Sequence, residues 1–418
     1  MQNLIAFCYS VNNILCRLID ILVISHACFM AINRKVYQLF LHDGIRIEIV
    51  APLTLDFPAG KREANKRAPG DPPMHFMELQ GNNPRTYTFE GLGALLDQLK
   101  PCIVVLDNDP VSRLAGEMGK WCKAHRAKLY CVSNENFSLG TIDTFSRRGW
   151  RNIPSAIIKR VMLKMNRRYV YGIFCINGDG KRIFESEGFS NVYHMPLGFD
   201  PEVFFPNTES RMRIRQKENL DKPVIAYFGR IVPEKGVDVL IRALGKIKHQ
   251  EWIFMLDHFD EYATAYSHQV KALMVEAGIL ERSVFVHPNH VEIADYMNSA
   301  DVAVVPSLSA AHWKEQYGRV AAEAMACGIP VIASDSGALP ELLGGRGIIF
   351  PEGNEEELSA CLSGILSGKN MNLAPAEEIA GYARQELSIN KQYQVMKKAF
   401  QEESRLTVNS THENSHRR

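Results

Sequence analysis

Two basic residues, Arg230 and Lys235, lie where a protein chain can bind a phosphorylated ligand. Both fall in a loop that follows the apolar run 224–228 and opens with Gly229. A helix is predicted to begin at residue 237, so its free N–H groups lie beside the two cations. Two cations and a helix N-terminus are together suited to binding a diphosphate. The alternative is that both side chains are ordinary solvated surface charge.

Glu315 and Glu323 form a second polar pair. Glu315 lies in a polar loop, whereas Glu323 lies in the helix predicted over 319–327, which Gly318 precedes. If both were helical, their spacing would turn them about 80° apart, so one helical face does not explain it. With Glu315 in the loop, both carboxylates can accept hydrogen bonds from hydroxyl groups of one ligand. The alternative for Glu323 is an ordinary exposed helix position.

Apolar runs that alternate with helical patterns occur in two series along the chain. This alternation predicts parallel sheets flanked by helices, so we expect an α/β protein with two doubly wound, Rossmann-like domains. Ligands of such sheets bind at the carboxyl ends of the strands. The runs predicted as strands are 21–25, 45–50, 103–106, 128–132 and 172–176 in the first series, and 224–228, 252–256, 284–286, 302–305, 330–333 and 347–350 in the second.

The segment 195–206 contains three prolines and a glycine and predicts the connection between the domains. The Pro- and Gly-rich segment 56–85 is predicted to be a long loop. The expected division is an N-terminal domain over 1–200, a C-terminal domain over 201–385, a helix over 386–404 that packs back on the first domain, and a disordered tail over 405–418.

Composition excludes several classes of protein. The 418 residues carry 48 Lys and Arg against 47 Asp and Glu, whereas nucleic-acid binders are strongly basic. The nine cysteines are scattered without a CxxC pair, which favours thiols in a reducing compartment over a disulfide frame or a zinc site. No stretch has the roughly 18 uncharged apolar residues of a membrane span, and the first residues lack a signal-peptide pattern. We therefore expect a cytoplasmic protein that binds no nucleic acid.

The residues that follow Glu315 resemble the signature of glycosyltransferase family 4. That signature is two glutamates separated by seven residues, then an Ala-Met-Ala-x-Gly-x-Pro-Val run and a Gly-x-x-Pro-Glu segment. In this chain Glu323 is followed by 324–331, which matches the run, and by 337–341, which matches the segment. The loop 229–236 is similar to the family's phosphate-binding loop. The resemblance covers nearly the whole chain and implies the two-domain GT-B fold.

The resemblance also implies a function. It predicts a retaining enzyme that moves a hexose from a UDP- or GDP-linked sugar to a glycan or lipid-linked acceptor, in polysaccharide or cell-envelope glycan synthesis. The first domain is then the acceptor-binding domain and the second the donor-binding domain. A nucleotide-sugar epimerase or hydrolase on the same fold, or a non-catalytic nucleotide-sugar-binding subunit, remain as alternatives.

Roles for individual residues follow from the same resemblance. Arg230 and Lys235 neutralise the donor diphosphate together with helix dipoles, so neither a metal nor another cofactor is needed. Glu323 binds the ribose and Glu315 contacts the transferred sugar. The other implied donor contacts are at Gly229, Tyr317, Gly318, Arg319, Val320, His290 and Val291.

The first half of the chain departs from the family pattern after the first predicted strand. A Gly-Gly loop is usual there, but residues 25–34 contain no glycine. His26, Asn33 and Arg34 are candidate replacements that face the acceptor side. A packed histidine and a helix-capping asparagine are the alternatives.

A second departure follows the run 128–132. Many family members have a histidine at this place, whereas this chain has Glu135, with Asn134 and Asn136 as less favoured candidates. A carboxylate here is suited to binding acceptor hydroxyls or assisting their deprotonation, so we count Glu135 among the catalytic candidates.

Two further segments have competing interpretations. Asp107 and Asp109 form a DxD triplet, which is typical of metal sites in another glycosyltransferase fold, but Asp109 precedes Pro110 and a helical pattern, so a helix N-cap is the simpler prediction. Residues 147–168 are basic and partly apolar, which suits the inner face of an anionic membrane or an acidic acceptor. A solvated helix face is the alternative for this second segment.

Overall fold

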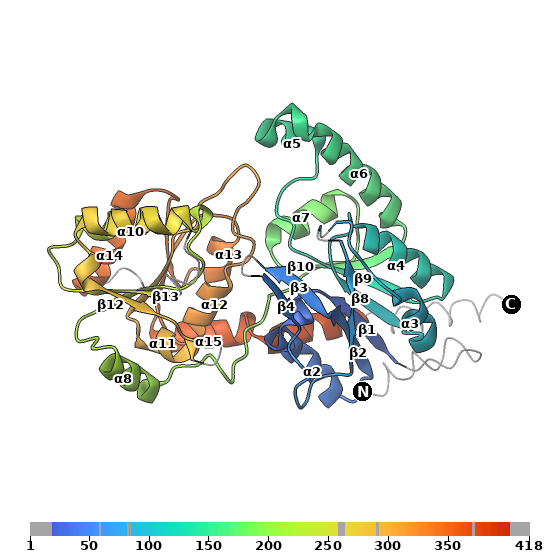
Figure 1. The fold of residues 1–418 in the computed structure, drawn as a ribbon, viewed down its shortest axis with the longest axis horizontal. Helices are drawn as coiled ribbons and strands as arrows, with labels where there is room; N and C mark the ends of the chain where they lie inside the picture. Colours follow the sequence, from blue (N-terminus) through green and yellow to red (C-terminus); the bar gives the residue numbers. More distant parts are fainter. Residues whose placement is uncertain are drawn as a thin grey trace, which may run out of the picture. The chain divides into compact units, whose positions relative to one another are not determined.

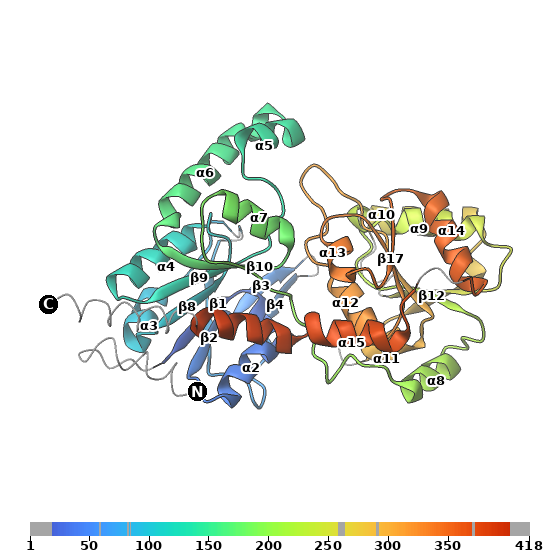
Figure 2. The same cartoon turned by 180° about the vertical axis from the view of Figure 1, so that it is seen from behind.

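The computed structural model describes residues 19–57, 60–81, 83, 85–257, 264–289, 292–369 and 373–401. The chain divides into two compact units: unit 1 is Met1–Pro196 with Ile389–Arg418, and unit 2 is Leu197–Ser388. Figures 1 and 2 draw them from opposite sides. Each unit contains a parallel sheet flanked by helices, as the alternating apolar runs predict. The predicted disordered tail over 405–418 lies outside the described residues.

Seven parallel strands form the main sheet of unit 1, in the order β11-β10-β9-β8-β1-β2-β5. Alternate residues of a strand face opposite sides, so Leu22 and Ile24 join one core while Ile21 and Val23 join the other. The strands are β1 (Ile21–Ser25), β2 (Ile47–Pro52), β5 (Met74–Met77), β8 (Ile103–Asp107), β9 (Lys128–Ser133), β10 (Val170–Cys175) and β11 (Val192–His194).

Helices cover both faces of this sheet. The core around Leu22 is covered by α3 (Leu92–Leu99), α4 (Arg113–Ala124), α6 (Ile153–Arg167) and α7 (Gly178–Ser186), and α5 (Thr141–Arg148) precedes α6. The core around Ile21 is covered by α2 (Lys35–His42) and by residues 389–401, which are helical.

Residues 389–401 belong to unit 1 although they follow all of unit 2 in the sequence. The ring of Phe400 lies 5.0 Å from that of Tyr130 and 5.9 Å from that of Phe174, measured between centroids. The hydroxyl of Tyr130 donates a hydrogen bond to the carbonyl oxygen of Ala399. Figure 2 shows this helix, in red, along the sheet of unit 1.

The prediction of a long loop over 56–85 is wrong in part. This segment contains most of a hairpin of β3 (Thr54–Phe57) and β4 (Gly60–Glu63), followed by the edge strand β5 and by β6 (Leu79–Gln80), which pairs with β7 (Thr88–Phe89). These strands have two to four residues each, and β4 reads Gly-Lys-Arg-Glu. Strands of two to four residues are too short to show a clear apolar run or alternation, and β4 also lacks apolar side chains.

Unit 2 has six parallel strands in the order β14-β13-β12-β15-β16-β17. They are β12 (Val224–Tyr227), β13 (Ile253–Asp257), β14 (Ser283–Val286), β15 (Val302–Val305), β16 (Val331–Ser334) and β17 (Ile348–Phe350). The helices are α8 (Thr208–Lys217), α9 (Val237–Lys246), α10 (Ala265–Ala277), α11 (Ile293–Ser299), α12 (Arg319–Ala326), α13 (Leu339–Leu343), α14 (Glu355–Leu366) and α15 (Ala376–Glu386).

Each sheet has one point where the strand order reverses. In unit 2 the chain builds outward from β12 to β14 and then returns to β15, so the reversal lies between β12 and β15. In unit 1 it lies between β1 and β8. Loops that leave such neighbouring strands in opposite directions open a crevice at their carboxyl ends, where ligands of this architecture bind.

Candidate functional site

The loop after β12 brings Arg230 and Lys235 to the strand reversal of unit 2. Gly229 has φ 139°, a conformation that favours glycine. The hydroxyl of Tyr227 donates a hydrogen bond of 2.7 Å to the carbonyl oxygen of Arg230 and fixes the start of the loop. The side chain of Arg230 is exposed, which leaves its guanidinium accessible to a ligand.

Gly236 holds the end of this loop against the end of β15. Its φ is 63°, and a Cβ at this position would lie 2.0 Å from the carbonyl oxygen of Pro306. The N–H of Leu308 also donates to the carbonyl oxygen of Glu234, at 2.8 Å. Only glycine fits this close approach, so the backbone itself places Lys235 beside the residues that follow β15.

Glu315 meets Lys235 at this place. The ammonium of Lys235 lies 2.6 Å from Oε2 of Glu315, and the hydroxyl of Ser307 donates to the same oxygen at 2.7 Å. Glu315 lies outside any helix and is buried. The structure thus brings the loop after β12 and the loop after β15 into direct contact through Lys235 and Glu315.

The backbone around Glu315 is equally constrained. The carbonyl oxygen of Glu315 accepts a hydrogen bond of 3.0 Å from the N–H of Ala338. A Cβ on Gly337 would lie 2.0 Å from that same carbonyl oxygen. The segment that follows β16 is therefore packed directly on the Glu315 loop.

Gly318 is the N-cap of α12 and has the left-handed conformation, with φ 90°. The N-terminus of this eight-residue helix carries the positive end of the helix dipole. Arg319 and Val320, the first two helical residues, are half-buried, and Tyr317 is buried just before them. This arrangement is suited to binding an anion.

Glu323 lies further along α12, and its side chain is only 8% exposed. The alternative of an ordinary exposed position is therefore wrong. Burial raises the pKa of Glu323 to about 7, although the nearby Arg319 acts to lower it. A buried carboxyl that titrates near neutral pH is a frequent feature of functional sites.

Several residues of this site were not identified from the sequence. Ser307 and Ser336 follow β15 and β16; the first bonds Glu315, and the second accepts from its N–H at 3.4 Å. Lys235 also lies 5.1 Å from the ring centroid of Trp313. Ser307 and Ser336 could have been noticed in the sequence, because each is a serine that closely follows a predicted buried strand. His290 and Val291, which the resemblance implies as donor contacts, lie outside the described residues.

In unit 1, His26 lies at the strand reversal. Ser25 ends β1 and donates a hydrogen bond of 2.6 Å to Asp107 at the end of β8. The ring nitrogen Nδ1 of His26 lies 3.8 Å from the same carboxylate, and its side chain is 48% exposed. The packed-histidine alternative is therefore wrong, because His26 is available to a ligand.

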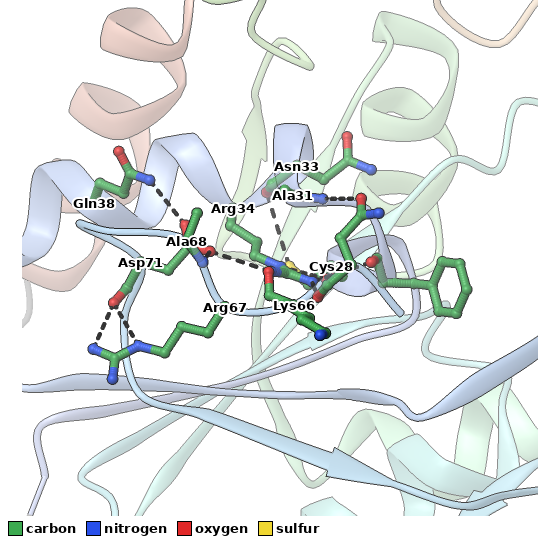
Figure 3. Close-up of polar contacts among 11 residues, drawn as sticks. Cys28, Ala31, Asn33, Arg34, Gln38, Lys66, Arg67, Ala68 and Asp71 are labelled. Atoms are coloured by element: carbon green, nitrogen blue, oxygen red, sulfur yellow. Dashed lines mark hydrogen bonds and ion pairs between the residues drawn. The ribbon is translucent and has the colours of Figure 1, made fainter. Parts of the chain in front are cut away.

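Arg34 does not face a ligand, which corrects the prediction for this residue. Its guanidinium is fully buried and makes five hydrogen bonds, one of them to Asp71 at 3.1 Å. Figure 3 shows Arg34 between the turn that carries Cys28 and the segment 66–71. Arg34 thus anchors the segment 66–71 to the turn after β1. The resemblance could not reveal this structural role, because that segment lies more than thirty residues away from Arg34. Asn33, half-buried, donates to the carbonyl oxygen of Ala27 at 2.7 Å.

Glu135 lies in the loop after β9, within a half-buried polar cluster. Its carboxylate lies 3.5 Å from the ammonium of Lys159 on α6 and accepts from the N–H of Phe137. The hydroxyl of Ser133 donates to Asp109 and accepts from the N–H of Glu135. Asn134 is exposed beside this cluster, whereas Asn136 is buried. The strand ends of unit 1 thus present two carboxyl groups and one ammonium in a small region.

Asp109 does not cap a helix, contrary to the sequence interpretation. The hydroxyl of Ser112 accepts the N–H of Ala115 and is the N-cap of α4. Burial raises the pKa of Asp109 to about 6, reinforced by the negative charge of Glu135 and opposed by the hydrogen bond from Ser133. Within the described residues there is no cluster of three or more His, Cys, Asp or Glu side chains that is suited to a metal ion.

Comparisons with known proteins bear on the site in unit 2. Residues 209–385 match the family model of glycosyl transferases group 1. Over 191 residues the chain is 30% identical to a D-inositol 3-phosphate glycosyltransferase of Mycobacteroides abscessus, covering 44% of this chain and 42% of that protein. A GDP-mannose-dependent alpha-(1-6)-phosphatidylinositol monomannoside mannosyltransferase of Mycolicibacterium smegmatis is 33% identical over 158 residues, covering 35% and 39%. The match thus spans about two fifths of these relatives, whose names indicate a transferase enzyme.

Solved structures identify the fold. Anabaena HepE, determined with UDP and glucose, gives a TM-score of 0.66 at 17% identity, over 91% of this chain and 98% of that chain. Sucrose-phosphate synthase of Thermosynechococcus elongatus gives 0.67 at 16% identity, over 92% and 98%. The fold is GT-B. Among the described residues, no helix is both long enough and apolar enough to cross a bilayer.

Proposed function

We propose that the protein is a retaining glycosyltransferase that moves a hexose from a nucleotide-diphosphate sugar to a glycan or lipid-linked acceptor, in polysaccharide or cell-envelope glycan synthesis. The observation that carries this proposal is the pairing of Lys235 with Glu315 at the strand reversal of unit 2, beside the N-terminus of α12. Cations, a helix N-terminus and carboxylates are the complementary partners of a diphosphate and of sugar hydroxyls.

In this proposal the diphosphate lies between the β12 loop and α12. The ammonium of Lys235 has three hydrogens; one is directed to Glu315, and the others are suited to phosphate oxygens. Arg230, exposed on the same loop, supplies the second cation. Glu315 orients the transferred hexose, and Glu323 accepts hydrogen bonds from the ribose. The donor base is uracil or guanine, and the relatives support both: HepE was solved with UDP, and the mannosyltransferase is named GDP-mannose-dependent.

The transfer step needs no metal in this proposal. The bond between the anomeric carbon and the diphosphate breaks, and its electron pair goes to the leaving diphosphate. Arg230, Lys235 and the dipole of α12 stabilise that charge as it develops. The acceptor oxygen bonds to the anomeric carbon on the face that the diphosphate leaves, and its proton passes to the diphosphate.

The acceptor side is proposed to lie at the strand ends of unit 1. Glu135 is the candidate for binding or polarising an acceptor hydroxyl, because it is held by Lys159 and by the N–H of Phe137. Exposed His26 and Asn134 are candidates for further acceptor contacts. We propose that the enzyme works in the cytoplasm, where the described cysteines, all buried free thiols, remain reduced.

The test has two parts. A thermal-shift panel of UDP, GDP and ADP without added metal should give a concentration-dependent rise in melting temperature for one of them. Product analysis by NMR, with the matching nucleotide sugar and with EDTA present, should then give a glycoside of the donor's own anomeric configuration. No shift with any nucleotide would refute the donor site, an inverted product would refute retention, and loss of turnover in EDTA would refute metal independence.

A further inference from the structure

The surface of α5 and α6 carries an unusual share of the exposed apolar side chains. Eleven large apolar side chains are exposed among the described residues, and six of them fall between residues 145 and 165. They are Phe145, Trp150, Ile157, Ile158, Val161 and Met165. Single exposed apolar residues are common on proteins, but such a concentration marks an interaction surface.

Four of these residues form a stripe along α6. At 100° per residue, Ile157, Val161, Met165 and Ile158 fall within an arc of about 100°. The buried residues of this helix, Ala156, Leu163 and Asn166, lie on the opposite face. The stripe is therefore the outward face of the helix and not part of the core of unit 1.

The inward face of α6 is firmly attached. The amide of Asn166 donates to the carbonyl oxygens of Pro110 and Ser112, at 2.8 and 3.0 Å, before the start of α4. Leu163 joins the core of unit 1. Figures 1 and 2 both show α6 beside α4. Because this side is fixed, α6 cannot turn its apolar stripe inward without breaking these contacts.

Cations flank the stripe. Arg151, Lys164, Arg167 and Arg168 are exposed, and the only acidic residue between 141 and 168 is Asp143. Two further cations of the segment have acidic partners: Lys159 lies beside Glu135, and Arg160 lies 2.8 Å from Glu187. The outward face of α6 thus has an apolar centre and positively charged residues around it.

We propose that the surface of α5 and α6 (residues 141–168) docks on the surface of an anionic lipid bilayer, with α6 lying in the membrane plane. The apolar stripe enters the boundary between headgroups and acyl chains, and the exposed cations contact lipid phosphates. Trp150, 69% exposed, is the kind of side chain that favours this boundary. A soluble acidic partner would satisfy the cations but would leave the apolar stripe in water. The inference is independent of the transfer reaction proposed above.

Vesicle co-sedimentation of the full chain tests this surface. Binding should be strong to vesicles of phosphatidylcholine with 30% phosphatidylglycerol, at least tenfold weaker to pure phosphatidylcholine, and weakened by 0.5 M salt. The double variant Ile157→Ser with Val161→Ser should reduce binding at least tenfold. The matched control, Met212→Ser with Val275→Ser, removes exposed apolar residues of unit 2 and should bind as the unaltered chain does.

Folding and donor binding are measured on the same samples. The nucleotide-induced rise in melting temperature should be equal in both double variants, so that loss of vesicle binding reports the surface and not the donor site. Equal binding of both double variants, equal binding to neutral vesicles, or no binding at all would overturn the proposal. A dimer in sedimentation velocity that Ile157→Ser with Val161→Ser dissociates would also overturn it, because a second copy would then cover the stripe.

Discussion

The ammonium of Lys235 and the carboxylate of Glu315 lie 2.6 Å apart, although 80 residues separate them in the sequence. One follows β12 and the other follows β15, the two strands at which the sheet order of unit 2 reverses. The pair therefore joins the two loops that leave the sheet at this reversal. Changes to either loop are expected to alter both the charge and the shape of the proposed donor site.

Lys235→Ala should weaken binding of the cognate nucleoside diphosphate by about 10- to 100-fold, since a hydrogen bond to a charged group contributes about 1.5–3 kcal/mol. Isothermal titration calorimetry measures this change. Lys246→Ala is the control, because Lys246 ends α9, the helix that follows the loop of Lys235, and pairs with Glu356 at 2.9 Å. Equal affinities of the two variants would contradict the assignment of Lys235.

Gly236→Ala should destabilise unit 2 and abolish donor binding. Its Cβ would meet the carbonyl oxygen of Pro306, so overpacking of about 1–3 kcal/mol adds to a left-handed strain of about 1–2 kcal/mol. Gly368→Ala is a matched control, with φ 64° but no atom within 4 Å of the added Cβ. Urea unfolding should give a larger loss for Gly236→Ala, and equal losses would show that the close approach is unimportant.

Glu323→Gln should make the protein more stable at pH 8 but not at pH 4.5. Burial raises the pKa of Glu323 from 4.5 to about 7. Between pH 4.5 and 7, the folded state therefore keeps a proton on Glu323 that the unfolded state has lost. Stability therefore falls as the pH rises through this window, by up to about 3 kcal/mol, and glutamine avoids this loss. Melting temperatures of both proteins from pH 4.5 to 8 measure the difference.

The same variant should lose the pH dependence of donor binding. A carboxylate that accepts ribose hydroxyls binds best when ionised, so affinity of the unaltered protein should rise between pH 6 and 8. If Glu323→Gln keeps the same slope, another group is responsible for it.

Arg34→Met should lower the melting temperature by roughly 6–20 °C, because it leaves Asp71 buried without its cation, at a cost of about 3–5 kcal/mol. Both side chains are at most 1% exposed. Arg46→Met is the control, since Arg46 pairs with Asp20 but is 47% exposed and should change stability by about 1 kcal/mol or less. Scanning calorimetry compares them, and similar shifts would argue against a structural role for Arg34.

Glu135→Gln should reduce turnover with little change in donor affinity. Its carboxylate lies beside Lys159 in unit 1, whereas the proposed diphosphate site lies in unit 2. Glu135 is proposed to bind and polarise the acceptor hydroxyl, and a hydrogen bond to a charged group contributes about 1.5–3 kcal/mol, so single-turnover rates should fall by about 10- to 100-fold. Glu187→Gln also removes a carboxylate that pairs with a cation of α6, Arg160, and should keep normal rates.

The sheets and the loops of the proposed donor site could be predicted from the sequence, because the residues that identify them are close together in the chain. Buried parallel strands appear as apolar runs, and Gly229, Gly236 and Gly318 mark the turns between strand and helix. The strands of the segment 56–85 could not be predicted, because strands of two to four residues are too short to show a clear apolar run or alternation.

What the sequence could not provide were contacts between distant residues. The position of Arg34 after β1 predicts a side chain that faces a ligand. In the structure Arg34 is buried and pairs with Asp71, which lies 37 residues away in the sequence. Glu323 could not be identified as buried, since helical spacing alone does not say which face the core covers. Asp109 was interpreted as a cap because Pro110 follows it, but the cap is Ser112.

The path of the chain through unit 1 also determines the order in which its core can form during synthesis. Met396, Ala399 and Phe400 belong to the same core as Phe40, Tyr130 and Phe174, but they leave the ribosome after the whole of unit 2. Unit 2 can therefore complete its fold while unit 1 still exposes an aromatic face. A ribosome that stalls shortly before residue 389 would present that face to chaperones and to other nascent chains.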